Sequence, residues 1–205
     1  MSRNTRELIL DSALQLFNSN NVDQVTIRDV AKKAKISHGN LQYHFPNIEN
    51  LVESLYNRLV AELDEQFRKM TGQEISLQVL NASTAVTFRL LYKYKFLMLD
   101  FVSVMRKSKY IREHYRNLYR MRKDQFRIVL QWMLKEGYLK AERYPGHYEK
   151  VIEQLFIIGD FWIASAEILF EGKEADKIDH YSDIINQVML PYFTEKTLLE
   201  LSKLA

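Results

Sequence analysis

Apolar residues recur at steps of three and four over most of the chain, and this spacing places them on one face of an α-helix. The first stripe predicts a helix over residues 4–18 and consists of Leu8, Ile9, Ala13, Leu16 and Phe17. From Leu51 to Phe67 an apolar residue stands at every fourth position, which predicts a long helix over residues 47–70. No segment alternates apolar and polar residues as a half-buried strand does. The pattern therefore predicts an all-α fold.

Helix-breaking residues divide the rest of the chain into further helices. Gly72, Gly137 and Gly172 follow apolar stripes, and Pro145-Gly146 separates two of them. These helices are expected at about residues 76–91, 93–105, 111–133, 147–170 and 176–190, with a short tail helix at 195–204.

Two short helices with a tight turn between them follow the first helix. Thr26 stands at the start of the first, where its hydroxyl can accept a bond from a first-turn N–H and Asp29 can complete a capping box. The second begins at Ser37, so only Lys35-Ile36 joins the two. Helices joined so tightly cannot run antiparallel and must cross steeply. This arrangement is a helix-turn-helix.

The second short helix has an unusual exposed face. Leu41 and Phe45 are expected to face the core, which leaves for solvent His38, Gly39, Asn40, Gln42, Tyr43 and His44. The face has no Glu and no Lys, but its amide, imidazole and phenol groups both donate and accept hydrogen bonds. Asn and Gln can bond an adenine edge twice, while Tyr, His and Ser reach phosphate oxygens. The chemistry favours DNA binding over an ordinary polar surface.

At these residues the chain resembles the TetR family of bacterial transcriptional regulators. The family pattern is matched by Thr26, Val30, Ala31, Ala34, Ile36, Ser37, Gly39, Leu41, His44, Phe45 and Leu51. Lys35 departs from it by replacing a turn glycine, and a left-handed conformation there would cost about 1 kcal/mol. Gln42 replaces a tyrosine, and Ile48 stands where a lysine often meets phosphate. The resemblance covers residues 5–55.

The resemblance implies a homodimeric, ligand-responsive regulator, which we expect to be a repressor that a small-molecule effector releases from a palindromic operator. Residues 1–50 are expected to form the three-helix domain that binds double-stranded DNA, and residues 51–205 a helical domain that binds the effector and dimerises. The base-reading candidates are Arg28, His38, Asn40 and Gln42. The expected phosphate contacts are Thr26, Ser37, Gly39, Tyr43 and His44.

Composition sets further bounds on the class of protein. With 205 residues and 47% hydrophobic content, the chain can bury the cores of one small and one medium domain. It has no cysteine, no apolar signal core and no apolar run long enough to cross a bilayer, so we expect a soluble cytoplasmic protein that binds no membrane. Residues 1–50 hold six basic and five acidic side chains. DNA affinity must therefore depend on neutral donors, helix N-termini and a few cations.

Basic residues concentrate in the middle of the chain. Residues 89–150 hold sixteen basic and six acidic side chains, whereas residues 151–205 hold four and ten. Seven cations would share one face if the helices at 93–105 and 111–133 were nearly continuous, namely Arg106, Lys109, Arg112, Arg116, Arg120, Lys123 and Arg127. This basic stripe is explained by a solvated face, by pairing with the acidic last quarter of the chain, or by attraction of an anionic ligand.

Large, adaptable side chains are enriched in the middle helices. Most must form the core, but a ligand-sensing bundle also needs a pocket with apolar walls and a few polar groups such as tyrosine hydroxyls. The pocket candidates are Phe88, Tyr92, Phe101, Met105, Tyr115, Phe126, Trp132, Phe156 and Trp162.

Catalytic chemistry has no support in the sequence. There is no G-x-S-x-G, no phosphate-cradling glycine loop and no H-E-x-x-H, so we expect neither an enzyme nor a cofactor. Acids and a histidine at metal-compatible spacings occur at Asp176, Asp179, His180 and Asp183. Because acids in a first helical turn are already explained by the helix dipole, we expect no metal site.

The helices expected at 147–170 and 176–190 each have two apolar sides, and a helix with two apolar sides needs two partners. Ile184 and Met189 are expected to face the subunit's own core, and the other side a second subunit. Two such helices from each subunit would form a four-helix bundle around the two-fold axis that a palindromic operator requires. The predicted interface comprises Leu155, Gly159, Trp162, Ile178, Tyr181, Ile185, Val188 and Tyr192.

A different functional class is the main alternative. A helical bundle could bind an apolar small molecule as a carrier or enzyme and have lost operator specificity. Its support is the departure of Lys35, Gln42 and Ile48 from the family pattern.

Overall fold

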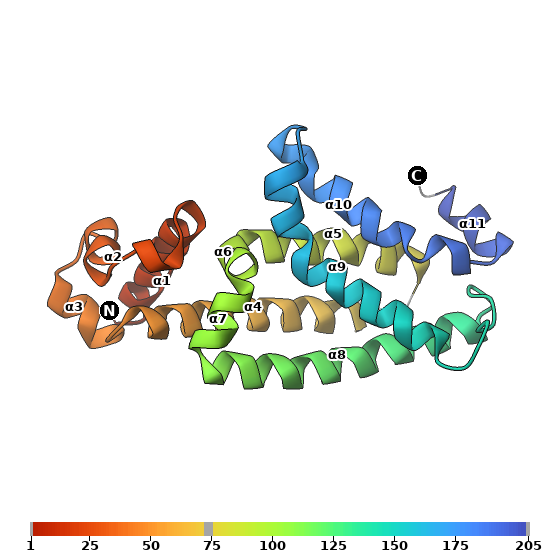
Figure 1. Cartoon of the computed structure of the whole chain (residues 1–205), viewed down its shortest axis with the longest axis horizontal. Helices are drawn as coiled ribbons and strands as arrows, with labels where there is room; N and C mark the ends of the chain where they lie inside the picture. Colours follow the sequence, from red (N-terminus) through yellow and green to blue (C-terminus); the bar gives the residue numbers. More distant parts are fainter. Residues whose placement is uncertain (1, 72–75, 204–205) are drawn as a thin grey trace. The chain divides into compact units, whose positions relative to one another are not determined.

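The computed structural model describes residues 2–71 and 76–203, and within these ranges it is helical apart from turns, loops and one isolated bridge between Leu139 and Phe193 (Figure 1). The all-α prediction is confirmed. The α-helices are α1 (Ser2–Ser19), α2 (Ile27–Lys33), α3 (His38–His44), α4 (Ile48–Thr71), α5 (Leu77–Lys93), α6 (Lys95–Leu99), α7 (Phe101–Lys107), α8 (Lys109–Lys135), α9 (His147–Leu169), α10 (Lys177–Gln187) and α11 (Glu195–Leu201). Short 3-10 helices are η1 (Val22–Gln24), η2 (Glu174–Asp176) and η3 (Leu190–Tyr192). None of the described helices is both long and apolar enough to cross a membrane.

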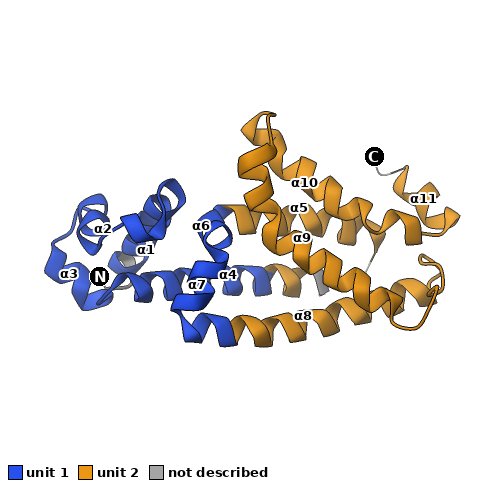
Figure 2. Cartoon of the chain, in the orientation of Figure 1, with its two compact units in different colours: residues 1–65, 93–113 blue, residues 66–92, 114–205 orange. Residues whose placement is uncertain are grey.

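The chain divides into two compact units (Figure 2). Unit 1 consists of residues 1–65 and 93–113, and unit 2 of residues 66–92 and 114–205. The sequence predicts a division at residue 50, which separates the three helices expected to bind DNA from the rest of the chain. The compact unit that contains those helices is larger, because most of α4 together with α6 and α7 belongs to it.

The helix expected at 93–105 is the element that the sequence predicted wrongly. The structure has two short helices there, α6 and α7, divided at Asp100 with φ −97° and ψ 19°. The Asp100 carboxylate accepts a hydrogen bond from the Val22 N–H at 3.5 Å, which ties the bend to η1. Ser108 is extended and ends α7. The basic stripe is therefore interrupted, since Arg106 precedes this break and the other six cations lie on α8.

The predicted capping box and turn are both confirmed. Thr26 Oγ1 accepts a hydrogen bond from the Asp29 N–H at 3.2 Å, and the Asp29 carboxylate accepts one from the Thr26 N–H at 2.9 Å. The Thr26 hydroxyl, followed by the Thr26 N–H, holds the pKa of Asp29 below its usual value. In the turn, Lys35 has φ 55°, which is the left-handed region that favours glycine.

Unit 1 is built around side chains that its helices turn inward. Leu41 is the one residue that α3 buries completely, and Phe45 follows it at the C-cap with 2% exposure. Burying a Leu or Phe side chain stabilises by roughly 1.5–3 kcal/mol. Phe17 of α1 packs against Phe96 of α6 with ring centroids 5.1 Å apart. The same core contains Ile9, Leu10, Ala13, Val30, Ala34, Leu51 and Leu55.

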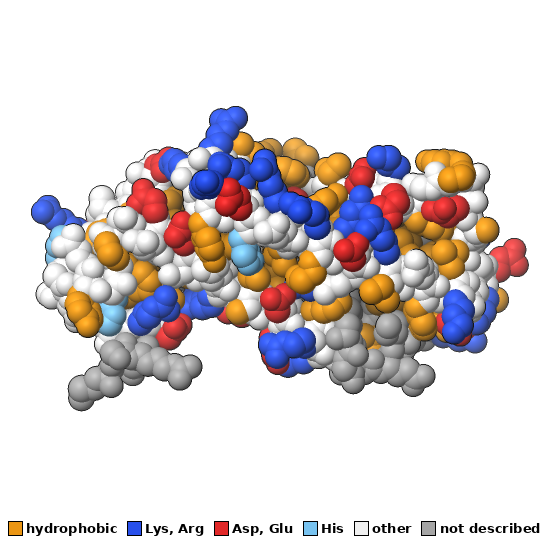
Figure 3. Space-filling view, turned by 90° about the horizontal axis from the view of Figure 1, so that it is seen from below, with side chains coloured by type: hydrophobic (Ala, Val, Ile, Leu, Met, Phe, Trp, Pro, Cys, Tyr) orange, Lys and Arg blue, Asp and Glu red, His pale blue; other side chains and the backbone are white. Residues whose placement is uncertain are grey.

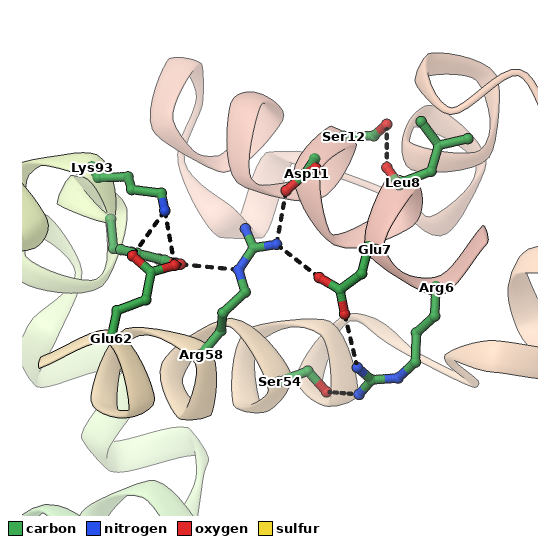
Figure 4. A network of polar contacts seen from close by, with 10 residues as sticks. Arg6, Glu7, Leu8, Asp11, Ser12, Ser54, Arg58, Glu62 and Lys93 are labelled. Carbon is green, nitrogen blue, oxygen red and sulfur yellow. Dashed lines mark hydrogen bonds and ion pairs between the residues drawn. The ribbon is translucent and has the colours of Figure 1, made fainter. Parts of the chain in front are cut away.

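A polar network joins α4 to α1 and to the start of α6 within unit 1 (Figure 4). Arg58 of α4 donates to the Asp11 carboxylate of α1 at 2.7 Å and to the Tyr94 hydroxyl at 2.9 Å. The Tyr94 hydroxyl donates in turn to Glu62, one turn along α4, at 2.6 Å. Tyr94 is completely buried, and this burial is the main reason that its pKa is raised. Lys93 pairs with Glu62 at 2.8 Å, so the Lys93-Tyr94 turn is held against α4.

Unit 2 packs around a second apolar cluster, which contains Leu77, Leu130, Met133, Leu139, Tyr148, Val151, Ile152 and Phe193. On its surface, Lys123 of α8 lies 3.0 Å from Glu153 of α9, and Arg127 lies 2.5 Å from Glu149. Pairing with acidic residues therefore accounts for the last two cations of the basic stripe. Figure 3 shows Lys and Arg side chains gathered on the face where α8 lies.

The left-handed turn gives a direct stability test. Lys35→Gly should raise the free energy of unfolding by about 1 kcal/mol, because glycine adopts this conformation without a Cβ clash. Lys33→Gly, at the last residue of α2, is the matched control and should lower it by about 0.5–1 kcal/mol. Urea denaturation measures both, and an equal loss for the two variants would contradict strain at Lys35.

Candidate DNA-binding surface

The helix α3 stands in the position of the recognition helix of a helix-turn-helix. Its N-cap is Ser37, whose hydroxyl oxygen accepts a hydrogen bond from the Asn40 N–H at 3.2 Å. Leu41 and Phe45 fix its inner side, as the sequence predicted. The outer side is thus free of any packing role within unit 1.

The outer side of α3 presents polar groups to solvent. His38, Asn40 and Gln42 are exposed, and within the described residues their side chains make no hydrogen bond to the protein. Tyr43 is 84% exposed and packs edge-on against the half-buried His44, with ring centroids 5.3 Å apart. Exposed polar groups of this kind can form hydrogen bonds with water. These donors and acceptors are therefore available to an external partner.

Gly39 lies on the same exposed face and has no local reason to be glycine. A Cβ built at this position meets no atom within 4 Å. Its φ is not in the left-handed region, which Gly137 and Gly146 do occupy. The missing side chain leaves open space on this face, and a helix without a side chain at one position can come closer to a backbone or a ligand.

Thr26 and Ser37 are both predicted phosphate contacts, but they differ in whether the hydroxyl proton is already used in a hydrogen bond. The Thr26 hydroxyl donates to the Asp29 carboxylate at 2.6 Å, so its proton is already used inside the capping box. The Ser37 hydroxyl only accepts in its cap, so its proton remains for a phosphate oxygen. Arg28 is exposed on the first turn of α2.

Arg6 is a residue whose role sequence reasoning missed. Its guanidinium lies 5.0 Å from the centroid of the Phe45 ring and donates to the Ser54 hydroxyl at 3.3 Å, so it links the end of α3 to α4. Asn47 caps α4 by accepting a hydrogen bond from the Asn50 N–H at 2.9 Å. Beside these residues is a surface cleft of about 380 Å³ lined by Arg6, His44, Phe45, Pro46, Asn50, Glu53, Ser54, Asn57 and Tyr110.

The pocket candidates fall into both units. Phe101 and Met105 belong to unit 1, and the other seven belong to unit 2. In unit 2, Trp162 stacks on Phe88 with ring centroids 4.6 Å apart, and the Tyr92 ring centroid lies 5.9 Å from that of Trp162. Phe126 also packs against Phe156, and Trp132 packs against Tyr138.

Polar groups lie close to this aromatic stack. The Trp162 Nε1–H is buried and has no acceptor among the described residues. The Tyr92 hydroxyl donates to Glu167 at 2.8 Å, and Glu167 accepts from Lys177 at 2.8 Å. Burial is the main cause of the raised pKa of Tyr92, and the bond to Glu167 is the main cause of the raised pKa of Lys177. The described residues contain no group of three His, Cys, Asp or Glu side chains that could hold a metal, and Asp179 instead pairs with Arg89.

Three residues of the predicted dimer interface are buried within one subunit. Trp162, Tyr181 and Ile185 are 2%, 7% and 9% exposed within one subunit, because they face the subunit's own core. Others of the set pack against the apolar cluster of unit 2, namely Leu155, Val188 and Tyr192. The apolar residues that α9 and α10 leave exposed are Ile157, Phe161, Ile168, Leu169 and Ile184. Helical period alone does not say which of two apolar sides is the inner one.

Two family models match the chain. One, described as bacterial regulatory proteins of the tetR family, matches residues 9–55, and one described as bacterial transcriptional repressor matches residues 58–201. The tetracycline repressor protein class D of Escherichia coli is 30% identical over 89 residues, which are 43% of this chain but only 40% of that protein. The HTH-type transcriptional regulator QacR of Staphylococcus aureus is 26% identical over 145 residues, which are 68% of this chain and 73% of QacR.

Solved structures share the fold. A TetR-family transcriptional regulator from Marinobacter aquaeolei VT8 has a TM-score of 0.83 at 19% identity over 93% of this chain and 92% of that one. A transcriptional regulator from Saccharomonospora viridis in complex with choline scores 0.71 at 20% identity, covering 92% and 96%. The SmeT–triclosan complex scores 0.66 at 18% identity, covering 95% and 94%. Since the matched models span both the helix-turn-helix and the helices that follow it, the chain belongs to the TetR family of bacterial transcriptional regulators.

Proposed function

We propose that this regulator is a homodimeric repressor that binds a palindromic operator through α3 and leaves it when a small molecule binds. The observation that carries the proposal is the outer side of α3, where the side chains of His38, Asn40 and Gln42 make no hydrogen bond within the described protein. The same face contains Gly39, whose missing side chain leaves open space. Operator binding also sets the location, because it requires the compartment that contains bacterial DNA, the cytoplasm.

Five residues of the surface have roles that their chemistry supports. Gln42 and Asn40 are the adenine readers, because a side-chain amide donates and accepts at the same time. Tyr43 and Ser37 donate to phosphate oxygens, and Gly39 lets the phosphate backbone come close to α3. These contacts are mostly neutral, so the salt dependence of binding should be smaller than for a strongly basic DNA-binding protein.

Ligand responsiveness is supported by two similar structures and by the continuity of α4. The similar structures contain choline in one case and triclosan in the other. In this chain α4 starts four residues after α3 and runs unbroken from Ile48 to Thr71, with its first part in unit 1 and its last turns in unit 2. An effector that prefers one position of α4 can therefore change the spacing of the two recognition helices in a dimer.

The exposed apolar residues of α9 support a dimer. Ile157, Phe161 and Ile168 stand at steps of four and seven, which places them on one side of the helix, and Ile168 is 80% exposed. Apolar groups that share one exposed helix face favour burial against a partner. A second copy is the partner that a palindromic operator requires, since two-fold symmetry in DNA matches two-fold symmetry in protein.

Genomic footprinting of the purified protein tests this function. A short palindrome near the protein's own gene is expected, with affinity that depends on base sequence. Regulators of this family are DNA-binding proteins and not enzymes, so a carrier of apolar molecules is the rival that remains. Binding that is salt-sensitive but indifferent to sequence would favour that rival.

Gln42→Ala should weaken binding by about 1–3 kcal/mol and relax the base preference at one position of each half-site. Tyr43→Phe is the matched variant on the same face and should weaken all sequences alike, because it removes only a phosphate donor. Competition against single-base variants of the operator measures both effects. An equal loss across every variant for Gln42→Ala would make Gln42 a phosphate contact.

Gly39→Ala should separate stability from DNA binding. Alanine has the higher helix propensity and its Cβ meets no atom here, so the free energy of unfolding should rise by about 0.5–1 kcal/mol. Operator affinity should nevertheless fall at least tenfold, since the methyl group enters the space meant for the phosphate backbone. Unchanged operator affinity in a filter-binding assay would show that Gly39 does not face DNA.

Phe161→Glu combined with Ile168→Glu should leave a helical but monomeric protein, because two charges would be buried between the copies. The dimer dissociation constant should rise at least hundredfold, and operator affinity should fall with it. Ile128→Glu on α8, where Ile128 is 62% exposed, is the control and should remain dimeric. Sedimentation of all three proteins decides, and a dimeric double variant would place the interface elsewhere.

A further inference from the structure

Four acidic side chains stand on one face of α9. Glu149, Glu153, Asp160 and Glu167 are separated by 4, 7 and 7 residues, steps that return to the same side of an α-helix. A carboxylate that loses hydration on folding needs a cation or hydrogen-bond donors as compensation. The partners of these four groups therefore reveal what each one does.

Three of the four have a cation inside the subunit. Lys123 of α8 lies 3.1 Å from Glu149 and 3.0 Å from Glu153. Lys177 at the start of α10 lies 2.8 Å from Glu167. These pairs hold α9 to α8 and α10, and they explain the three carboxylates without any external partner.

Asp160 differs from them. In the described part of the chain its partner is not a cation but the Tyr115 hydroxyl of α8, which donates to the carboxylate at 2.5 Å. Burial raises the pKa of Asp160 to about 6, although the bond from Tyr115 acts in the opposite direction. Between about pH 4 and pH 6 the folded protein holds a proton that the unfolded chain has lost, so stability falls as pH rises through this window. At neutral pH the protein therefore carries a half-buried charge that destabilises it.

Aromatic rings accompany this carboxylate. Phe156 stands one turn before Asp160 on α9. The Phe156 ring centroid lies 4.6 Å from that of Tyr119 and 5.6 Å from that of Phe126, both on α8. Faces of aromatic rings attract cations by about 0.5–2 kcal/mol. A carboxylate that has no cation partner among the described residues and stands one helical turn from such a ring cluster has the chemistry of a site for an organic cation.

We propose that Asp160 is the charge-recognition residue of the effector site and that the effector is an organic cation with an apolar body. The proposal rests on the proposed function, because it presupposes an effector. The carboxylate pairs with the cation, the Tyr115 hydroxyl holds the carboxylate in position, and the rings of Phe156 and Tyr119 contact the apolar body. A metal ion requires several oxygen or nitrogen ligands, and the described residues offer no such cluster. An anionic effector would be repelled by the same carboxylate.

Two isosteric probes test the charge requirement on the full-length protein. Benzyltrimethylammonium carries the charge, and neopentylbenzene has the same shape without it. At pH 7.5, tryptophan fluorescence titration should give at least tenfold tighter binding of the cation. Asp160→Asn should abolish this preference and leave neopentylbenzene affinity unchanged. Lowering the pH to 5 should weaken cation binding to the natural protein about tenfold, since Asp160 becomes protonated, and should not affect the Asn variant.

Asp183→Asn is the matched control, because Asp183 is an exposed carboxylate on α10 of the same unit. It should bind both probes as the natural protein does. Asp160→Asn should also raise the Tm by a few degrees at pH 7.5 and not at pH 4, which shows that the variant is folded. Equal affinity of the natural protein for the two probes, or an unchanged preference in Asp160→Asn, would overturn the proposal. A fall in Tm for Asp160→Asn would overturn it too, because Asp160 would then be a structural residue.

Operator binding separates this proposal from the proposed function. Asp160→Asn should bind operator DNA as tightly as the natural protein in the absence of probe, because Asp160 belongs to unit 2 and α3 to unit 1. Benzyltrimethylammonium should weaken operator binding of the natural protein and have at least tenfold less effect on the variant. Specific operator binding without any cation preference would refute the cationic effector and leave the repressor standing. Absence of sequence-specific binding would refute the repressor itself.

Discussion

A helix of seven residues does not hold itself together in water, since helix nucleation is unfavourable and so few hydrogen bonds follow it. The polar face that we propose for DNA binding therefore depends on contacts that stabilise α3 from outside the helix. Leu41 and Phe45 anchor its inner side, and Ser37 caps its start. Because these groups supply the stability, the outer side is free to hold glycine, amides and imidazoles, which are poor choices for stabilising a helix.

The support of α3 extends further along the chain than the helix-turn-helix itself. Arg58 links α4 to Asp11 of α1 and to Tyr94, and its Nη2 atom is buried without a hydrogen-bond partner among the described residues. Asn18 at the end of α1 donates to the Lys93 carbonyl at 2.9 Å. Tyr94 is completely buried and Arg58 mostly so, and removing the partner of a buried polar group is costly because the remaining group is left unsatisfied. A displacement of residues 93–94 would therefore also displace α4 and α1, to which these residues are bonded.

Much of this fold could be predicted from sequence because its determinants are local. Helix periods, the Thr26–Asp29 box and the strained Lys35 depend on residues a few positions apart. The bend at Asp100 could not be predicted, since apolar residues continue through it and its contact with η1 is 78 residues distant. The Arg58–Tyr94 link likewise joins residues 36 apart and leaves no periodic trace.

Two features of the candidate sites needed the structure for physical reasons. In a helix with two apolar sides the sequence pattern does not distinguish the inner side, so it places Ile184 in the core although the structure exposes this residue. In the sequence Asp160 is only a break in an apolar run, and the structure shows that it has no cation partner among the described residues. The free outer face of α3, in contrast, was predictable, because Leu41 and Phe45 leave a helix this short no other orientation.

The central claim is that two copies present α3 to one palindromic operator at a fixed spacing, and electron spin resonance can measure it. The chain has no cysteine, so Lys33→Cys, exposed at the end of α2, carries one nitroxide label per copy. On operator DNA, double electron–electron resonance should give one narrow distance peak, because two-fold symmetry and a half-site spacing of about 34–36 Å or a multiple fix both copies. A broad distribution on the operator, or no dipolar coupling because a single copy binds, would contradict the account.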